Sequence, residues 1–350
     1  MNEQNKLAVM PVRRLLYTMS GPLALSLLVQ SLYNIVDSIF VARLSEDALT
    51  AMSLAYAVQM LMIALSVGTA VGLNALLSQR IGARLVEEAC RAATTGLWLT
   101  LISALVFAVG GIFSSTIAGW MTDDAVLQAL CAKYLTIVML GSWGLFLQTY
   151  AQRLLQAVGD TVLSMASLLI GAGVNIVLNP LLIFGWCGLP ALGIRGSALA
   201  TVIGQTLGAL AAIIFNRRCN PLIHVQLHDY HFVWQDVTAI YRVGLPTIVT
   251  QALGSIMAFA VNALLIAVSP TAVAFFGVYY KLQNFLMMPL NGLGQAGDPD
   301  RRLQFWKRQL CTHSRDLACA RAFRCRVGAS WDSAVSAIAG PTAVVVLRGR

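Results

Sequence analysis

The stretch LVQSLYNIVDSIF, residues 28–40, places an aspartate, Asp37, inside an apolar segment that runs from Leu15 to Leu44. Helical spacing of three, four and seven residues puts three polar side chains on the same face as this aspartate: Gln30, Tyr33 and Asn34. A carboxylate near the centre of a membrane helix costs about 2.5–3.5 kcal/mol on insertion scales. Because such a cost usually marks a function, Asp37 is predicted to belong to a functional site.

The composition of the chain indicates a polytopic membrane protein. Of its 350 residues, 58% are hydrophobic and 11% are charged, and the mean hydropathy is +0.73. About a quarter of the residues in a soluble domain are charged. The net charge of +9 is concentrated in residues 297–350, which carry +6, whereas residues 1–296 carry +3. The expected surroundings are therefore a lipid bilayer, and no nucleic-acid partner is expected.

Eight apolar runs are long enough to cross a bilayer as helices. The predicted spans are 15–42, 48–79, 92–119, 129–157, 161–186, 192–216, 238–267 and 271–296. Arginine and lysine gather in the segments on one side of these spans, which include Arg80, Arg84 and Arg91. Because basic residues favour the cytoplasmic side, we expect a multi-pass protein of the bacterial inner (plasma) membrane with a cytoplasmic N-terminus.

A weak internal repeat suggests two lobes. A shift of 224 residues superposes Pro22 on Pro246, Ala48 on Ala272, Gln59 on Gln283 and Gly68 on Gly292. Six spans separate the copies, so both copies enter the membrane in the same direction, as in transporters with parallel repeats. The predicted fold is all-α and consists of a cytoplasmic N-terminus (1–14), a first six-helix lobe (15–216), a cytoplasmic linker (217–237) and the two helices that begin a second lobe (238–296).

Residues 297–350 break this pattern, because they are rich in arginine and contain no apolar run of spanning length. Codons for residues 298–306, entered at their second base, can encode Ile-Pro-Ile-Val-Gly-Phe-Asn-Phe-Gly, which would continue a membrane protein. We therefore interpret residues 297–350 as an out-of-frame, disordered tail that truncates the second lobe. An ordinary arginine-rich cytosolic tail is the alternative.

Several stretches together resemble the multidrug and toxic compound extrusion (MATE) family, in particular its MepA-like bacterial members. They are MPVRRLLYTMSGPLALSLLVQSLYNIVDSIFVARLSEDALTAMSLA at 10–55, GTAVGLNALLSQRIGA at 68–83, NIVLNPLLIFG at 175–185, GIRGSALATVIGQ at 193–205 and KLQNFLMMPLNGLGQA at 281–296. They extend through most of residues 10–296. In this family Gly-Gln-Ala is followed by a segment like the one that the shifted frame can encode.

The resemblance implies a secondary antiporter, and not an enzyme, that expels amphipathic and often cationic drugs in exchange for H⁺ or Na⁺, without another cofactor. Asp37 matches the coupling-ion aspartate of the first lobe, and Asn175 and Thr201 match two polar residues of the same network. Asn179 stands where some members carry a second aspartate. Asp37 is therefore the only acid expected deep in this lobe.

The residue pattern supports a coupling-ion site built from several helices. Asn175 and Asn179 lie four residues apart, and Pro180 follows and is expected to kink their helix. We expect the following residues to surround Asp37: Asn34, Asn175, Asn179 and Thr201. For the asparagines and the threonine, plain hydrogen bonding between helices is the alternative.

Further polar and aromatic residues are candidates for the wall of a substrate cavity. They are Gln30, Tyr33, Gln205, Gln251, Tyr279, Lys281, Gln283 and Asn284. Lys281 lies about ten residues into its span, too deep to reach either membrane surface easily. Packing against lipid is an equal alternative for the aromatic residues.

Other classes of function have less support. His224, His228 and His231 would share a helical face, but solvated histidines in a linker are expected there and no metal site is predicted. No phosphate-binding glycine loop with lysine occurs in the sequence, so ATP drive is not expected. Two alternatives to the antiporter remain: an inactive truncated fragment, or a flippase of lipid-linked oligosaccharides from the same superfamily.

Overall fold

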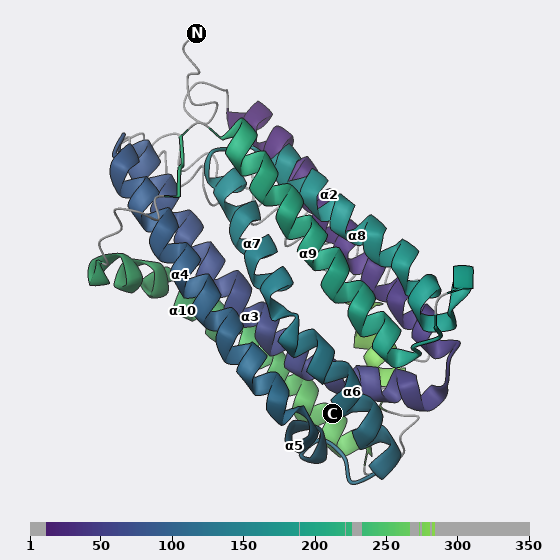
Figure 1. Ribbon diagram of the computed structural model, residues 1–350. Coiled ribbons are helices and arrows are strands. Elements are labelled where there is room, and N and C mark those ends of the chain that lie inside the picture. Colours follow the sequence, from purple (N-terminus) through teal and green to yellow (C-terminus); the bar gives the residue numbers. More distant parts are fainter. Residues whose placement is uncertain are drawn as a thin grey trace, which may run out of the picture.

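The computed structural model describes residues 12–188, 190–220, 222–225, 233–266, 273, 275–280 and 282–283. Within these residues the chain is a bundle of helices without strands (Figure 1). The predicted all-α class is therefore confirmed. The proposed out-of-frame tail and most of the predicted span 271–296 lie outside the described residues.

The helices have the following bounds: α2 (Val12–Ala42), α3 (Glu46–Gly82), α4 (Val86–Gly110), η1 (Gly111–Phe113), α5 (Ser114–Gly119), α6 (Ala125–Leu140), α7 (Ser142–Ala157), α8 (Thr161–Phe184), η2 (Trp186–Gly188), α9 (Ile194–Cys219) and α10 (Trp234–Ile266). Six spans among the described residues are long and apolar enough to cross a membrane. If the bent pair of α6 and α7 is counted as one further span, there are seven. The described part of the chain is thus a multi-pass bundle.

Local sequence explains where several helices begin and end. The Ser45 side chain accepts a hydrogen bond from the amide of Ala48 and caps α3, whose first turn also carries two acids. Asp124 caps α6 by accepting from the amides of Val126 and Leu127. At the end of α8, Gly185 has a φ of 74°, a left-handed conformation that favours glycine.

The predicted span 129–157 is not one straight helix. It divides at Gly141 into α6 and α7, which meet at an angle of 45°. A Cβ atom on Gly141 would lie 2.4 Å from the side chain of Val202 in α9, so the break lets α9 approach closely. The hydroxyl of Ser142 donates to the carbonyl of Ala104 and fixes the break against α4. These contacts are tertiary, which explains why the apolar run alone did not indicate the break.

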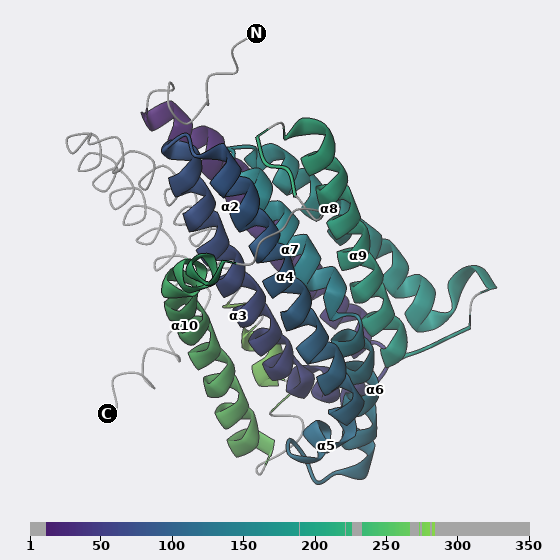
Figure 2. The ribbon, with the colours of Figure 1, turned by 60° about the vertical axis from the view of Figure 1, so that its left-hand side comes forward.

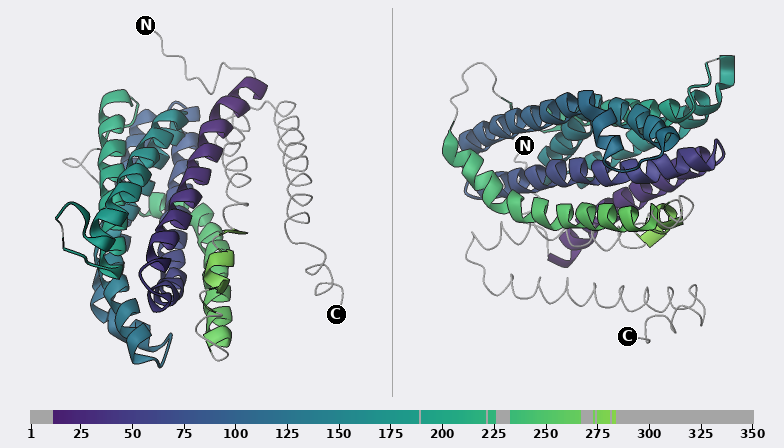
Figure 3. Two further views of the ribbon diagram at one scale, coloured as in Figure 1. Left: turned by 90° about the vertical axis from the view of Figure 1, so that its right-hand side faces the viewer. Right: turned by 90° about the horizontal axis from the view of Figure 1, so that it is seen from below.

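The bundle has a central helix and two sides. Helix α3 packs against α4, α6, α7 and α10, whereas α2 packs mainly against α8, which in turn pairs with α9 (Figure 1). Figure 2 shows α10 beside α3, and the view from below in Figure 3 shows α10 following α3 along the edge of the bundle. Helix α10 is mostly exposed along its apolar window.

Two hydrophobic clusters fill the bundle. The first gathers around the turn between α2 and α3 and includes Val41, Ile183 and Ala198. The second gathers toward the turn between α3 and α4 and includes Leu77, Ala89 and Ile240. The first cluster matters for the site, because Val41 and Ile183 lie one helical turn beyond Asp37 and Asn179.

Helix α10 begins within the predicted linker 217–237, because Trp234 to Val237 are helical. The apolar pattern did not indicate this first turn, since it contains Asp236, whose carboxylate is paired with arginines of other helices. Residues 226–232 of the linker lie outside the described residues.

Candidate functional site

Asp37 lies inside the bundle and contacts α9. Its side chain is 3% exposed, and its Oδ1 accepts a hydrogen bond of 2.7 Å from the hydroxyl of Ser197, which is fully buried. These residues are 160 positions apart in the sequence. The contact joins α2 to α9, two helices that otherwise touch little.

The start of α9 explains how Ser197 reaches this position. The amides of Leu192 and Gly193 donate to the carbonyls of Leu182 and Ile183 at the end of α8, so the chain folds back tightly. A Cβ atom on Gly196 would lie 2.4 Å from the carbonyl oxygen of Leu182. The absence of a side chain at Gly196 therefore allows α9 to start directly against α8.

A chain of hydrogen bonds links three of the predicted residues. The Asn175 amide donates to the hydroxyl of Thr201 over 3.2 Å, and the Asn179 amide donates to Oδ1 of Asn175 over 3.2 Å. All three side chains are buried, with exposed fractions of 2%, 7% and 0% for Asn175, Thr201 and Asn179. Ser197 precedes Thr201 by one helical turn, so one face of α9 contacts both Asp37 and the asparagines.

The Oδ1 atom of Asn179 is buried and has no hydrogen-bond partner among the described residues. An acceptor without a donor in a membrane interior is costly. Pro180 follows Asn179 inside α8, and α8 stays helical through it to Phe184. The amide oxygen thus remains available to a proton donor, a water molecule or a cation.

Two further predicted residues, Tyr33 and Gln205, interact with each other near Asp37. The Tyr33 hydroxyl interacts with the side chains of Asn34 and Gln205, and it lies within electrostatic range of Asp37. The Asn34 amide also donates to the backbone carbonyl of Gln30 over 2.9 Å. Gln30, Tyr33 and Asn34 are half-buried.

The structure adds residues that the sequence pattern did not single out. Besides Ser197, the Tyr134 hydroxyl accepts a hydrogen bond of 3.1 Å from the Gln59 amide, and Tyr134 lies within electrostatic range of Asp37. The spacing of four residues between Ser197 and Thr201 was a signal that could have identified the serine. No local pattern indicates Tyr134, because it enters from α6.

The remaining cavity candidates lie in α10 or follow it in the sequence. Gln251 is half-buried on α10, and Tyr279 and Gln283 are exposed. Lys281 and Asn284 lie outside the residues whose side chains are described. Between Gln251, Tyr279, Gln283 and Asp37 no joining contact is observed within the described part of the chain.

Chemically, this arrangement suits reversible binding of a proton or a small cation. A serine hydroxyl can donate to a carboxylate and accept from a carboxylic acid, so its contact with Asp37 can persist in both states. Carboxylate, hydroxyl and amide oxygens are also ligands that hard cations prefer. In the parts of the chain that the structure describes, no group of three histidine, cysteine or acidic residues could hold a metal.

The described part of the chain has the same fold as solved membrane transporters of the MATE type. Solved structures support the fold. The chain matches a structure titled "Reverse polarity of binding pocket suggests different function of a MOP superfamily transporter from Pyrococcus furiosus" with a TM-score of 0.83 and 24% identity, over 96% of this chain and 73% of that one. A crystal structure of MATE in complex with MaL6 gives the same TM-score and identity over 97% and 74%.

The family follows from sequence comparison. The MatE family model matches residues 22–181, which confirms the resemblance of this part of the chain to the MatE family. The chain is 29% identical to the probable multidrug resistance protein YoeA of Bacillus subtilis, over 79% of this chain and 60% of that protein. It is 24% identical to the multidrug export protein MepA of Staphylococcus aureus, over 83% and 64%.

The chain therefore spans less than two thirds of the length of these curated relatives. Members of the family are transporters rather than enzymes, which agrees with the prediction from sequence.

Proposed function

We propose that this chain acts as a secondary active efflux antiporter that exports amphipathic cationic compounds in exchange for H⁺ or Na⁺. The observation that carries this proposal is the carboxylate of Asp37, buried in a membrane-spanning helix and hydrogen-bonded to Ser197 of α9. Asn34, Asn175, Asn179 and Thr201 support this carboxylate as the coupling-ion site.

The proposed cycle depends on two states of Asp37. When the carboxylate takes up a proton or a cation, its negative charge is neutralised and its attraction for a cationic substrate is lost. Because the bound ion weakens substrate binding, the bound substrate weakens ion binding by the same factor. An ion that binds one conformation better than the other also shifts the populations toward that conformation. Ser197 is placed to transmit this change from α2 to α9, because its hydroxyl contacts the carboxylate directly.

The charge of the site favours cationic over anionic substrates. Asp37 is the only buried acid in α2 to α9 among the residues whose burial is described. We propose that half-buried Tyr33 and Gln205 line the cavity near this acid, and that Gln30, Gln251, Tyr279, Lys281, Gln283 and Asn284 extend its wall. One relative, from Shewanella oneidensis, is named as an FAD transporter, so an anionic substrate is the natural comparison in a test.

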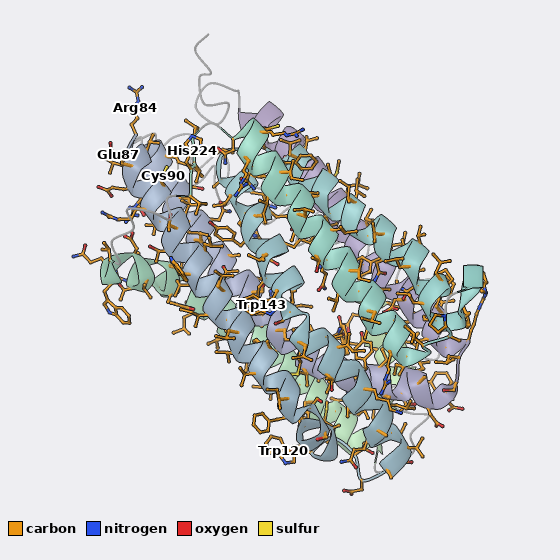
Figure 4. The ribbon with its side chains drawn as sticks, viewed as in Figure 1. Arg84, Glu87, Cys90, Trp120, Trp143 and His224 are labelled. Atoms are coloured by element: carbon orange, nitrogen blue, oxygen red, sulfur yellow. The ribbon has the colours of Figure 1, made fainter. Side chains whose placement is uncertain are left out.

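The proposed orientation puts the arginine-rich end of the bundle in the cytoplasm of a bacterial inner membrane. Figure 4 shows Arg84 at one end of the bundle and Trp120 toward the other. Trp120 is 76% exposed, as expected for an aromatic residue at a membrane interface. The N-terminus then lies on the cytoplasmic side.

Everted membrane vesicles that contain the full chain provide the test. We expect a fluorescent cationic dye to accumulate inside them when a pH or Na⁺ gradient is imposed across the membrane, and FAD to stay outside. The gradient that drives dye uptake identifies the coupling ion. Dye uptake equal to that of vesicles without the protein, under both gradients, would show that the chain does not transport alone and would leave the inactive fragment as the better account.

A further inference from the structure

A second buried carboxylate lies far from Asp37 in the sequence, in the first turn of α10. Asp236 is fully buried, and its Oδ1 accepts from Nη2 of Arg80. Its Oδ2 accepts from Nη1 of Arg80 over 3.3 Å and from Nε of Arg91 over 3.1 Å. Arg80 belongs to α3 and Arg91 to α4, so this one carboxylate joins three helices.

Arg80 is held by Glu88 as well as by Asp236. Nη1 of Arg80 also donates to the carbonyl of Glu88 over 2.7 Å, and Nε of Arg80 lies 3.5 Å from the Glu88 carboxylate. The Arg80 side chain is 12% exposed and that of Arg91 is 37% exposed. Separating one member of a buried ion pair from the other leaves a buried charge without a partner, which costs free energy. Such a cluster therefore resists opening.

Near the far end of the contact between α3 and α10, the Asn262 amide donates to the carbonyl of Ser53 over 3.4 Å. Between this bond and the ion cluster, glycines bring the two helices together. A Cβ atom on Gly72 would lie 2.1 Å from the carbonyl oxygen of Ile240, and one on Gly244 would lie 2.7 Å from that of Gly68. Backbones in such glycine contacts touch through surfaces without side chains, which carry little directional bonding. The ion cluster therefore supplies the directional contact that fixes α10 at this end of α3.

We propose that Arg80, Asp236 and Arg91 form a clasp that closes the arginine-rich end of the chain by holding α10 against α3 and α4, and that this clasp opens when α10 moves during the transport cycle. The proposal rests on the proposed antiport function, since a lobe that begins with α10 has to move relative to the first lobe. The glycine contact then allows the two helices to slide past each other, whereas the ion cluster holds them in one position.

The chain contains a native reporter of this motion. The Cys90 thiol is 5% exposed and lies beside Arg91 in the sequence. Its sulfur accepts from the amide of His224 at 3.3 Å and donates to the carbonyl of Leu222 at 3.6 Å, so the segment before α10 covers it. Figure 4 shows Cys90, Glu87 and His224 together at this end.

The experiment measures the rate at which a water-soluble maleimide labels Cys90 in everted membrane vesicles, using full-length variants that retain a single cysteine. Asp236→Asn keeps the size of the side chain and removes its charge, and we expect it to raise the labelling rate about tenfold or more. Arg91→Gln should raise the rate less, because Arg80 still holds the carboxylate. Combining both changes should add little to Asp236→Asn alone, because both act on one cluster.

Three controls make the result decisive. Glu87→Gln removes an exposed charge at the same end and should leave the labelling rate of Cys90 unchanged. A variant whose single cysteine is Cys131, which is fully buried in the first cluster, should stay unlabelled by a membrane-permeant maleimide when Asp236→Asn is added, which shows that the bundle remains folded. A third, with exposed Cys219 as its single cysteine, should label at the same rate with and without Asp236→Asn.

Labelling of Cys90 at the wild-type rate in both Asp236→Asn and Arg91→Gln would overturn the clasp. The clasp would also be overturned by two results together: labelling of Cys131 in Asp236→Asn, and an unchanged labelling rate of Cys90 in Arg91→Gln. The cluster would then only stabilise the fold. The assay needs no substrate, so loss of dye transport alone bears on the proposed function and not on the clasp.

Discussion

At the scale of single residues, the contact between Asp37 and Ser197 has the largest consequences. A carboxylate that loses water on entering a membrane interior needs hydrogen bonds to remain charged, and the serine hydroxyl supplies one at 2.7 Å. The bond also connects two helices whose contact is otherwise slight. In the proposed cycle, we therefore expect a change in the charge of Asp37 to act directly on the position of α9.

Replacing the serine tests this role. Ser197→Ala removes a donor from a buried acceptor, so we expect it to lower the free energy of unfolding by about 1–3 kcal/mol and to reduce gradient-driven dye uptake. Ser197→Thr keeps a hydroxyl and should retain most of both. Thermal unfolding of the purified protein in detergent measures the first effect, and equal melting temperatures for Ser197→Ala and the wild type would contradict it.

Only part of this site could be predicted from the sequence. Asp37 was evident because a charge in an apolar run violates the pattern of its own segment, and the asparagines were evident from their spacing of four residues. For Ser197 the only signal was its spacing of four residues from Thr201, since serine is common in membrane helices. Tyr134 was not evident, because its partner Gln59 belongs to a helix distant in the sequence. The same holds for Asp236, whose arginines lie 145 and 156 residues away.

At the scale of elements, the contact between α3 and α10 shows how small residues set the distance between helices. Gly68 and Gly72 lie four residues apart on one face of α3, opposite Gly244 of α10. Without side chains at these points, the two backbones come into direct contact. Such packing is a common means of association in membranes, where the hydrophobic effect does not drive helices together.

A matched pair of glycine substitutions tests this contact. In Gly72→Ala the new methyl group would meet the backbone of Ile240, so we expect a loss of about 1–3 kcal/mol in the free energy of unfolding. In Gly173→Ala the methyl group would meet nothing within 4 Å, and the better helix propensity of alanine should leave stability unchanged or raise it by about 1 kcal/mol. Thermal unfolding in detergent compares the two, and a Gly72→Ala variant as stable as Gly173→Ala would refute the close contact.

Element positions were largely predictable, because bilayer thickness fixes the length of an apolar run that spans it. The break at Gly141 was not, since the apolar pattern of 129–157 continues through it and its cause is the approach of Val202. Helix α10 begins at Trp234, four residues before the predicted span 238–267, and its polar first turn contains Asp236 with its ion pairs.

At the scale of the whole molecule, the two buried acids have different proposed roles. Asp37 lies inside the first bundle, where it can bind a proton or a cation, and Asp236 lies at the junction of that bundle with α10. Ion binding and lobe movement are thus assigned to different carboxylates. The lobe boundaries predicted from the internal repeat stay a prediction, as does the interpretation of residues 297–350.

The most direct test of the account is gradient-driven export by Asp37→Asn, a substitution that keeps the shape of the side chain and removes its charge. In everted vesicles we expect an imposed H⁺ or Na⁺ gradient to drive no more dye uptake with this variant than in vesicles without the protein. The control, Asp47→Asn, changes an exposed acid in the first turn of α3 and should behave as the wild type. Gradient-driven uptake by Asp37→Asn at the wild-type rate would contradict the assignment of Asp37 as the coupling-ion carboxylate.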